Sequence, residues 1–156
     1  MFYTLKNKID MLITQARVEG MIVGMFSATR TFEEQARFYA RGRAADGTIV
    51  DRDAVVTMAQ PGMSFHQYGL ACDLVFLVNG EWSWAEGNDW PRLGELGKKL
   101  GLEWGGDFPN FPDRPHFQLT YGLPIEKALA EYQKHKRIED VWALVIALGD
   151  KNAGLT

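Results

Sequence analysis

The sequence of 156 residues predicts an α+β fold, because helical and strand periodicities both occur along it. Over residues 3–18, apolar side chains recur every three or four positions and form one stripe of an amphipathic helix. Residues 70–78 are a short apolar run rich in Leu, Val and Phe, which is typical of a buried strand. Asn79-Gly80 follows directly and is a strong signal for a two-residue β-hairpin, with a returning strand from residue 81.

The other elements follow from similar patterns. Residues 21–26 predict a second buried strand, and Thr31 is a candidate N-cap for a helix over about 32–41. Residues 43–63 are rich in Gly, Asp, Arg and Pro and predict a long loop. The remaining predictions are a helix over 88–100, a short strand that runs into a glycine turn over 102–108, a strand over 115–119, and helices over 124–136 and 138–149.

Length and composition favour a single domain over 1–156, with a core over about 1–121 and a helical extension over about 122–156. Apolar residues make up 46% of the chain and charged residues 24%, which is ordinary for a globular protein. The net charge of -3 gives no reason to expect nucleic acid or an anionic membrane as a partner. The single cysteine excludes an intramolecular disulfide and fits a reducing compartment.

The N-terminus does not read as a signal peptide. It lacks a continuous apolar segment and carries charges at Lys6, Lys8 and Asp10. The longest apolar run, over 141–148, is far too short to span a bilayer. We therefore expect synthesis in the cytoplasm, so that any action outside the cell requires another component to release the protein.

Two short stretches carry the residues that suggest chemistry. The first places His66 and Asp73 seven residues apart with Gly69 between them, and the second contains Asp113 and His116. Asp73 is the one charge in an apolar strand, where a carboxylate is costly unless it is paired or binds a metal. Two imidazoles and one carboxylate are the ligands of an open catalytic zinc site, whereas structural zinc normally takes four ligands. The alternative for Asp73 is an ion pair with an arginine such as Arg30.

Asp113 and Arg30 are the candidate catalytic residues. Asp113 precedes His116 by three residues across a proline-containing turn, so it can lie near the metal without binding it. A general base that takes a proton from water is needed in that position. Arg30 lies between a predicted strand and helix and is a candidate to stabilise an oxyanion or hold a substrate carboxylate. The alternative is a surface arginine paired with Glu33 or Glu34.

Four other residues leave alternatives open. Glu103 is either a rival base or fourth ligand, or an exposed carboxylate at a strand end. Asp107 is either a partner that orients a ligand histidine, or an aspartate in a turn. We expect His135, among charged neighbours, to be a surface residue, and Cys72 to be a small buried side chain rather than a nucleophile.

These stretches resemble the motifs of a known family. Ser64-x-His66-x-x-Gly69-x-Ala71-x-Asp73 resembles the SxHxxGxAxD motif of the D-Ala-D-Ala carboxypeptidase/VanY-type (M15) peptidases, and Asp113-x-Pro115-His116-Phe117 is similar to their second motif. Thr29-Arg30-Thr31 followed by Gln35 resembles a segment of that family whose arginine contacts the substrate and transition state. Trp104-Gly105-Gly106-Asp107-Phe108 is similar to a segment of its L-alanyl-D-glutamate endopeptidase branch, which includes phage endolysins.

The resemblance covers roughly residues 20–120 and implies both a fold and a site. The implied fold is the hedgehog/DD-peptidase-like α+β fold, with a small central antiparallel sheet flanked by helices. The implied site binds zinc through His66, Asp73 and His116, with Asp113 as the base. Arg30, Gln35 and Ser64 are the residues assigned to substrate binding. The acid at position 113 is Asp rather than the Glu of some members, and the resemblance does not extend to the segment after about 122.

The implied substrate is the stem peptide of peptidoglycan. The leading hypothesis is a zinc endopeptidase that cleaves the L-Ala–D-Glu bond. The alternatives are a carboxypeptidase that removes terminal D-Ala and a non-catalytic metal-binding module of the same fold. A small chain without a signal peptide is typical of a phage lysin, so we expect a monomer that reaches the cell wall through a holin pore.

Overall fold

The computed structural model describes residues 1–154, which leaves the last two residues of the predicted helical extension, Leu155 and Thr156, outside the described part. The chain forms two units. The first combines Met1–Thr29 with Gly69–Tyr121, and the second combines Arg30–Tyr68 with the segment from Gly122 onward. The single-domain organisation expected from the sequence stays a prediction.

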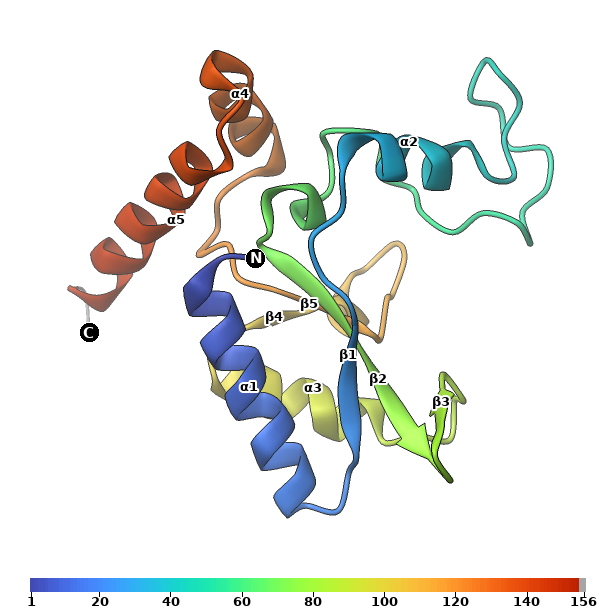
Figure 1. Cartoon of the computed structure of the whole chain (residues 1–156), viewed down its shortest axis with the longest axis vertical. Coiled ribbons are helices and arrows are strands. Elements are labelled where there is room, and N and C mark those ends of the chain that lie inside the picture. Colours follow the sequence, from blue (N-terminus) through green and yellow to red (C-terminus); the bar gives the residue numbers. More distant parts are fainter. Residues whose placement is uncertain (155–156) are drawn as a thin grey trace. The chain divides into compact units, whose positions relative to one another are not determined.

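A five-stranded antiparallel sheet forms the centre of the first unit (Figure 1). β2 pairs with β1 along one edge and with β5 and β3 along the other, and β4 pairs with β5. The strands are β1 (Val23–Ser27), β2 (Ala71–Val78), β3 (Glu81–Ser83), β4 (Glu103–Trp104) and β5 (His116–Gln118). Asn79 and Gly80 both have positive φ, at 52° and 85°, as the tight turn between β2 and β3 requires. The hairpin prediction is confirmed.

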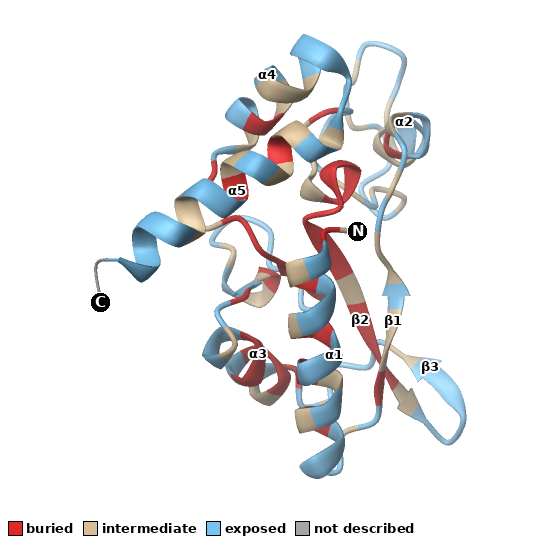
Figure 2. Cartoon of the chain, turned by 60° about the vertical axis from the view of Figure 1, so that its left-hand side comes forward, coloured by how far each residue is buried: buried red, intermediate tan, exposed pale blue. Residues whose placement is uncertain are grey.

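The two faces of this sheet differ in chemistry because side chains alternate along each strand. Cys72, Leu74 and Phe76 of β2 are buried on one face, together with Phe117 of β5. α1 (Tyr3–Val18) and α3 (Trp90–Lys99) form the helical part of this core. The rings of Phe76 and Trp90 pack edge to face, with 4.8 Å between their centres. Figure 2 shows buried residues along β2. The other face therefore carries Asp73 and His116.

Four helical elements and a long loop make up the second unit as far as residue 154. They are α2 (Phe32–Ala40), the 3₁₀ helix η1 (Phe65–Tyr68), α4 (Ile125–His135) and α5 (Ile138–Ala153). The Thr31 side chain accepts a hydrogen bond from the Glu34 backbone amide, and the Glu34 carboxylate accepts one from the Thr31 amide, so the predicted cap is confirmed. The rings of Phe32, Tyr68 and Tyr132 pack together, with Phe32 stacked on Tyr132 at 4.9 Å. This cluster joins η1 to α2 and α4.

The predicted elements agree with the structure to within one or two residues at each end, except for α5. The short strand predicted before the two glycines is β4, and the glycine turn predicted after it is the 3₁₀ helix η2 (Gly105–Asp107). α5 continues to Ala153, beyond the predicted end at Gly149, since a helix tolerates an internal glycine at a cost of about 1 kcal/mol. Residues 43–63 form the expected loop, with one isolated bridge between Arg43 and Ile49. Among the described helices, none has the length and apolar character needed to cross a bilayer.

Candidate functional site

Asp73 and His116 form the part of the site that the sheet builds. They are paired across β2 and β5, so both side chains lie on the face away from the apolar core. His116 Nδ1 lies 3.5 Å from Asp73 Oδ1. Both side chains are largely shielded from solvent, with 10% of the His116 side chain and 17% of the Asp73 side chain exposed. Since a slip of one residue would turn either side chain to the opposite face, the hydrophobic register of the sheet fixes this pair.

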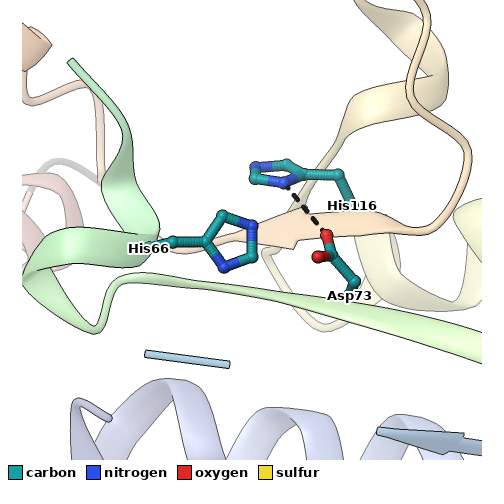
Figure 3. Close-up of side chains that lie close together, drawn as sticks. All are labelled: His66, Asp73 and His116. Atoms are coloured by element: carbon teal, nitrogen blue, oxygen red, sulfur yellow. Dashed lines mark ion pairs between the residues drawn. The ribbon is translucent and has the colours of Figure 1, made fainter. Parts of the chain in front are cut away.

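His66 reaches the same pair from η1, just before the chain enters β2. Its side chain is buried, and its backbone carbonyl accepts a hydrogen bond from the Arg30 amide at 3.1 Å. Gly69 has φ of 66°, a left-handed conformation that lets the chain turn between η1 and β2. One ligand atom from each of His66, Asp73 and His116 lies within 4.8 Å of the others, and Figure 3 shows the three side chains pointing toward one another.

This donor set fits zinc. Zinc binds imidazole nitrogen and carboxylate oxygen at about 2.0–2.2 Å in a tetrahedral arrangement, which separates neighbouring ligand atoms by roughly 3.4 Å. The 3.5 Å between His116 Nδ1 and Asp73 Oδ1 matches that separation. His66, with its ligand atom inside the same 4.8 Å limit, completes a set of three.

Hydrogen bonds assign the tautomer of His116. Glu103 Oε2, which only accepts, lies 2.7 Å from Gln118 Nε2 and thereby fixes the orientation of the Gln118 amide. Gln118 Oε1 then faces His116 Nε2 at 2.9 Å, so Nε2 carries the proton and donates it. Nδ1 is the other ring nitrogen; it lies 3.5 Å from Asp73 Oδ1 and is the atom that a metal would bind once the ring is neutral.

The pKa of His116 reflects two opposing effects. Burial is the larger single effect and disfavours the charged imidazolium. The hydrogen bond and negative charge of Asp73, the hydrogen bond with Gln118 and the charge of Asp113 together outweigh it, so the pKa of His116 is raised. The carboxylates of Asp73 and Asp113 thus favour a positive charge at His116.

Asp113 lies near His116 and is not one of the three candidate ligand residues. Its amide donates to the Gly105 carbonyl at 2.8 Å, and its own carbonyl accepts from the His116 amide at 3.1 Å. Its charge contributes to the raised pKa of His116, so its carboxylate is within electrostatic reach of the imidazole. Asp113 is half-buried. The role of general base stays a prediction.

The residues assigned to substrate binding all belong to the second unit. Arg30 donates from Nη1 to Gln35 Oε1 at 2.9 Å, and its guanidinium lies 4.7 Å from the centre of the Phe38 ring. Gln35 is completely buried and donates to the Ala59 carbonyl at 2.7 Å. In this structure Gln35 therefore orients Arg30 and ties down the long loop. Ser64 is half-buried and immediately precedes η1, and substrate binding by these residues stays a prediction.

The open alternatives are now distinguishable. Glu103 is exposed but bonds to Gln118 and Thr120, so its carboxylate supports the site indirectly. Asp107 pairs with Lys98 at 2.8 Å and is a surface turn residue. His135 is 66% exposed, as expected, and Cys72 is completely buried with a raised pKa, which fits the expected inert thiol. Gln118 was not among the predicted site residues, although its spacing of two from His116 in a strand placed it on the same face.

Comparisons with known proteins agree with this geometry. A family model described as D-alanyl-D-alanine carboxypeptidase matches residues 57–119. The chain is 37% identical over 123 residues to the peptidoglycan L-alanyl-D-glutamate endopeptidase CwlK of Bacillus subtilis, covering 73% of this chain and 70% of the relative. It is 30% identical over 112 residues to the L-alanyl-D-glutamate peptidase of Listeria phage A118, covering 70% of this chain and 34% of that protein.

A solved structure supports the fold. The vancomycin resistance D,D-pentapeptidase VanY, determined as a mutant in complex with Zn(II), superposes with a TM-score of 0.54 at 22% identity. The match covers 88% of this chain and 81% of VanY, so the predicted α+β fold of DD-peptidases is confirmed. With the ligand cluster, the matching family model and the identity to CwlK, the chain belongs to the M15 peptidase family.

Proposed function

We propose that the protein is a zinc-dependent peptidoglycan endopeptidase that cleaves the L-Ala–D-Glu bond of the stem peptide. The observation that carries this proposal is the convergence of His66, Asp73 and His116, whose ligand atoms lie within 4.8 Å of one another. The choice of bond rests on CwlK and the phage A118 relative, both of which are named for L-alanyl-D-glutamate cleavage.

Zinc is the proposed metal because two imidazoles and one carboxylate are its usual catalytic ligands. Three protein ligands leave a fourth position open, and zinc in such sites supplies Lewis-acid activation of a water molecule and of the substrate carbonyl. His116 presents Nδ1 because Nε2 donates to Gln118. Asp73 supplies the negative charge that offsets part of the charge of the cation.

Proton transfer is assigned to Asp113. Its carboxylate accepts a proton from the attacking water and returns it to the leaving nitrogen of D-Glu as the amide bond breaks. The products are a carboxylate on L-Ala and a free amine on D-Glu, so no further reactant is needed. Arg30, oriented by Gln35 at 2.9 Å, stabilises the negative charge that develops on the carbonyl oxygen, and Ser64 helps to bind the peptide.

The proposed site of action is the bacterial cell wall, reached by a monomer after release through a holin pore. The similarity to a phage peptidase supports an endolysin-type role. In that role the protein accumulates inside the cell, separated from the cell wall by the membrane, and acts only when the membrane is opened. Addition of the purified protein to permeabilised bacteria is expected to lower turbidity, whereas intact bacteria with an outer membrane are expected to resist it.

A DD-carboxypeptidase is the second candidate, because the matching family model carries that description. Such an enzyme must hold the free C-terminal carboxylate of its substrate with a cation. Arg30 is one candidate, and Arg114, which is about half exposed and lies 3.8 Å from Glu86, is another. The two activities release different products from the same stem peptide.

Mass spectrometry of muropeptides digested with zinc-loaded protein separates these functions. An L-Ala–D-Glu endopeptidase releases peptides that begin with D-Glu and leaves glycan that ends in L-Ala. A carboxypeptidase releases only D-Ala. Asp113→Asn serves as the inactive control. If neither product forms with fully loaded protein, the chain is not a peptidase, and a metal-binding module of the same fold becomes the better description.

A further inference from the structure

A chain of hydrogen bonds leads from His116 outward to Glu103 along the polar face of the sheet. His116 Nε2 donates to Gln118 Oε1 at 2.9 Å, and Gln118 Nε2 donates to Glu103 Oε2 at 2.7 Å. Glu103 Oε1 accepts from both the hydroxyl and the amide of Thr120. Each group in this chain has a single direction of donation, because the terminal carboxylate can only accept.

The sheet register sets up this arrangement. Glu103 on β4 is directly opposite Gln118 on β5, and Gln118 lies two residues from His116 on the same strand. Gln118 and His116 are each 8% exposed, whereas Glu103 reaches solvent. A buried amide is costly unless both of its ends are bonded, and here the two ends are bonded to His116 and Glu103.

We propose that Gln118 and Glu103 are positioning residues that hold His116 in the Nε2–H tautomer, so that Nδ1 is the atom that binds the metal. The proposal rests on the metal site of the proposed function. Without these hydrogen bonds, the neutral imidazole of His116 populates both tautomers and its ring can rotate about the Cβ–Cγ bond. With these hydrogen bonds in place, the proton of the neutral ring is held on Nε2, and Nδ1, which lies 3.5 Å from Asp73 Oδ1, is the nitrogen left to bind the metal. Outer partners of ligand histidines typically contribute about 10–100-fold to metal affinity.

Two variants test this directly. Gln118→Met keeps the length of the side chain and removes both hydrogen bonds. The double variant Gln118→Glu/Glu103→Gln reverses the positions of amide and carboxylate and leaves the net charge unchanged. In it the new carboxylate accepts from His116, and the new amide donates to that carboxylate while its oxygen accepts from Thr120. Gln133→Met, on the exposed side of α4, is the matched control for Gln118→Met.

The first readout is the tautomer of His116 in metal-free protein, measured by long-range ¹H–¹⁵N correlation NMR at alkaline pH, where the ring is neutral. The second is zinc affinity, measured by competition with a chelator. We expect wild type to show the Nε2–H form, and Gln118→Met to show mixed tautomers and a roughly 10–100-fold weaker affinity for zinc. The double variant is expected to keep the Nε2–H form and an affinity close to that of wild type.

Three results would overturn the proposal. They are an Nδ1–H tautomer in wild type, an unchanged tautomer and affinity in folded Gln118→Met, or a double variant as impaired as Gln118→Met. The wild-type spectrum decides the question even if Gln118→Met does not fold. Neither readout uses peptidoglycan, so a lack of peptidase activity would not be mistaken for failure of the proposed role of Gln118 and Glu103. A wild-type protein that binds no zinc would reject the proposed function and, with it, that role.

Discussion

Asp73 on β2 and His116 on β5 are directly opposed across the sheet, with 3.5 Å between Oδ1 and Nδ1. Their neighbours Cys72 and Phe117 are the next opposed pair and are completely buried on the other face. The packing that orders the core therefore also fixes the distance between two candidate metal ligands. Substitutions on the apolar face that alter the pairing of β2 with β5 are therefore expected to change the distance between Asp73 and His116.

Asp113→Asn is expected to abolish most hydrolysis while zinc binding is retained. The change removes the proton acceptor but leaves His66, Asp73 and His116 intact, so kcat should fall by about 10²–10⁴-fold. The measurement is kcat on a defined muropeptide beside the zinc content of the same sample. Asp107→Asn, which alters a surface carboxylate paired with Lys98, is the control and should remain active. Undiminished turnover in Asp113→Asn would eliminate Asp113 as the base.

Gly97→Ala is expected to destabilise the first unit, although alanine is the better helix former. A Cβ at Gly97 would lie 2.5 Å from Cε1 of Phe117, so α3 and β5 would have to move apart. Overpacking of this kind costs typically about 1–3 kcal/mol. Urea unfolding measures the change, and Gly87→Ala, with no atom within 4 Å of its added Cβ, is the control. An equally stable or more stable Gly97→Ala protein would contradict the packing described here.

Trp142→Phe is expected to loosen η1. The indole Nε1 of Trp142 in α5 donates to the carbonyl of Tyr68 at 2.7 Å, and Tyr68 follows His66 by two residues. Loss of this bond leaves a buried carbonyl unsatisfied and should cost about 1–3 kcal/mol, with weaker zinc binding. Trp84→Phe, at a site 49% exposed, controls for the loss of indole area. If both variants have wild-type stability and zinc affinity, the C-terminal helices do not support His66.

Cys72 is expected to resist thiol reagents in the native protein at about pH 8, where a free thiol is partly ionised. Burial, followed by the negative charge of Asp73, raises the pKa of its thiol. Because the pKa of Cys72 is raised in the folded state, the thiol ionises first in the unfolded protein. Its contribution to the free energy of unfolding is therefore complete below the ordinary thiol pKa of about 8.5 and is lost as the pH rises beyond it. The slope of unfolding free energy against pH should therefore be smaller in Cys72→Ala above that pH. Rapid labelling of Cys72 in the native protein would contradict its burial in β2.

Local signals predicted the parts of the fold that short-range interactions determine. The stripe over 3–18 became α1, Asn79-Gly80 became the hairpin turn, and Thr31 capped α2, because each depends on neighbours in sequence. The roles of Gln35 and Gln118 could not be read in this way. Gln35 bonds to Ala59 across the long loop, and Gln118 meets Glu103 only when β4 and β5 pair.

The same distinction applies to the candidate site. Residue types and the family resemblance singled out His66, Asp73 and His116, and the fold brings their ligand atoms together. Asp107, which follows two glycines in sequence, was one candidate partner for a ligand histidine, yet it bonds to Lys98. Side-chain partners across strands depend on register, which the sequence pattern alone did not define.

The most direct test of the account is the release of stem peptides from purified peptidoglycan as zinc is added back to metal-free protein. We predict no release without metal, a linear rise in activity up to one equivalent of zinc, and a plateau beyond it. Asp73→Asn, which removes a ligand charge, should shift this titration to much higher zinc. Full activity in verified metal-free protein, or no released peptide at saturating zinc, would contradict the central claim that this chain is a zinc-dependent peptidoglycan peptidase.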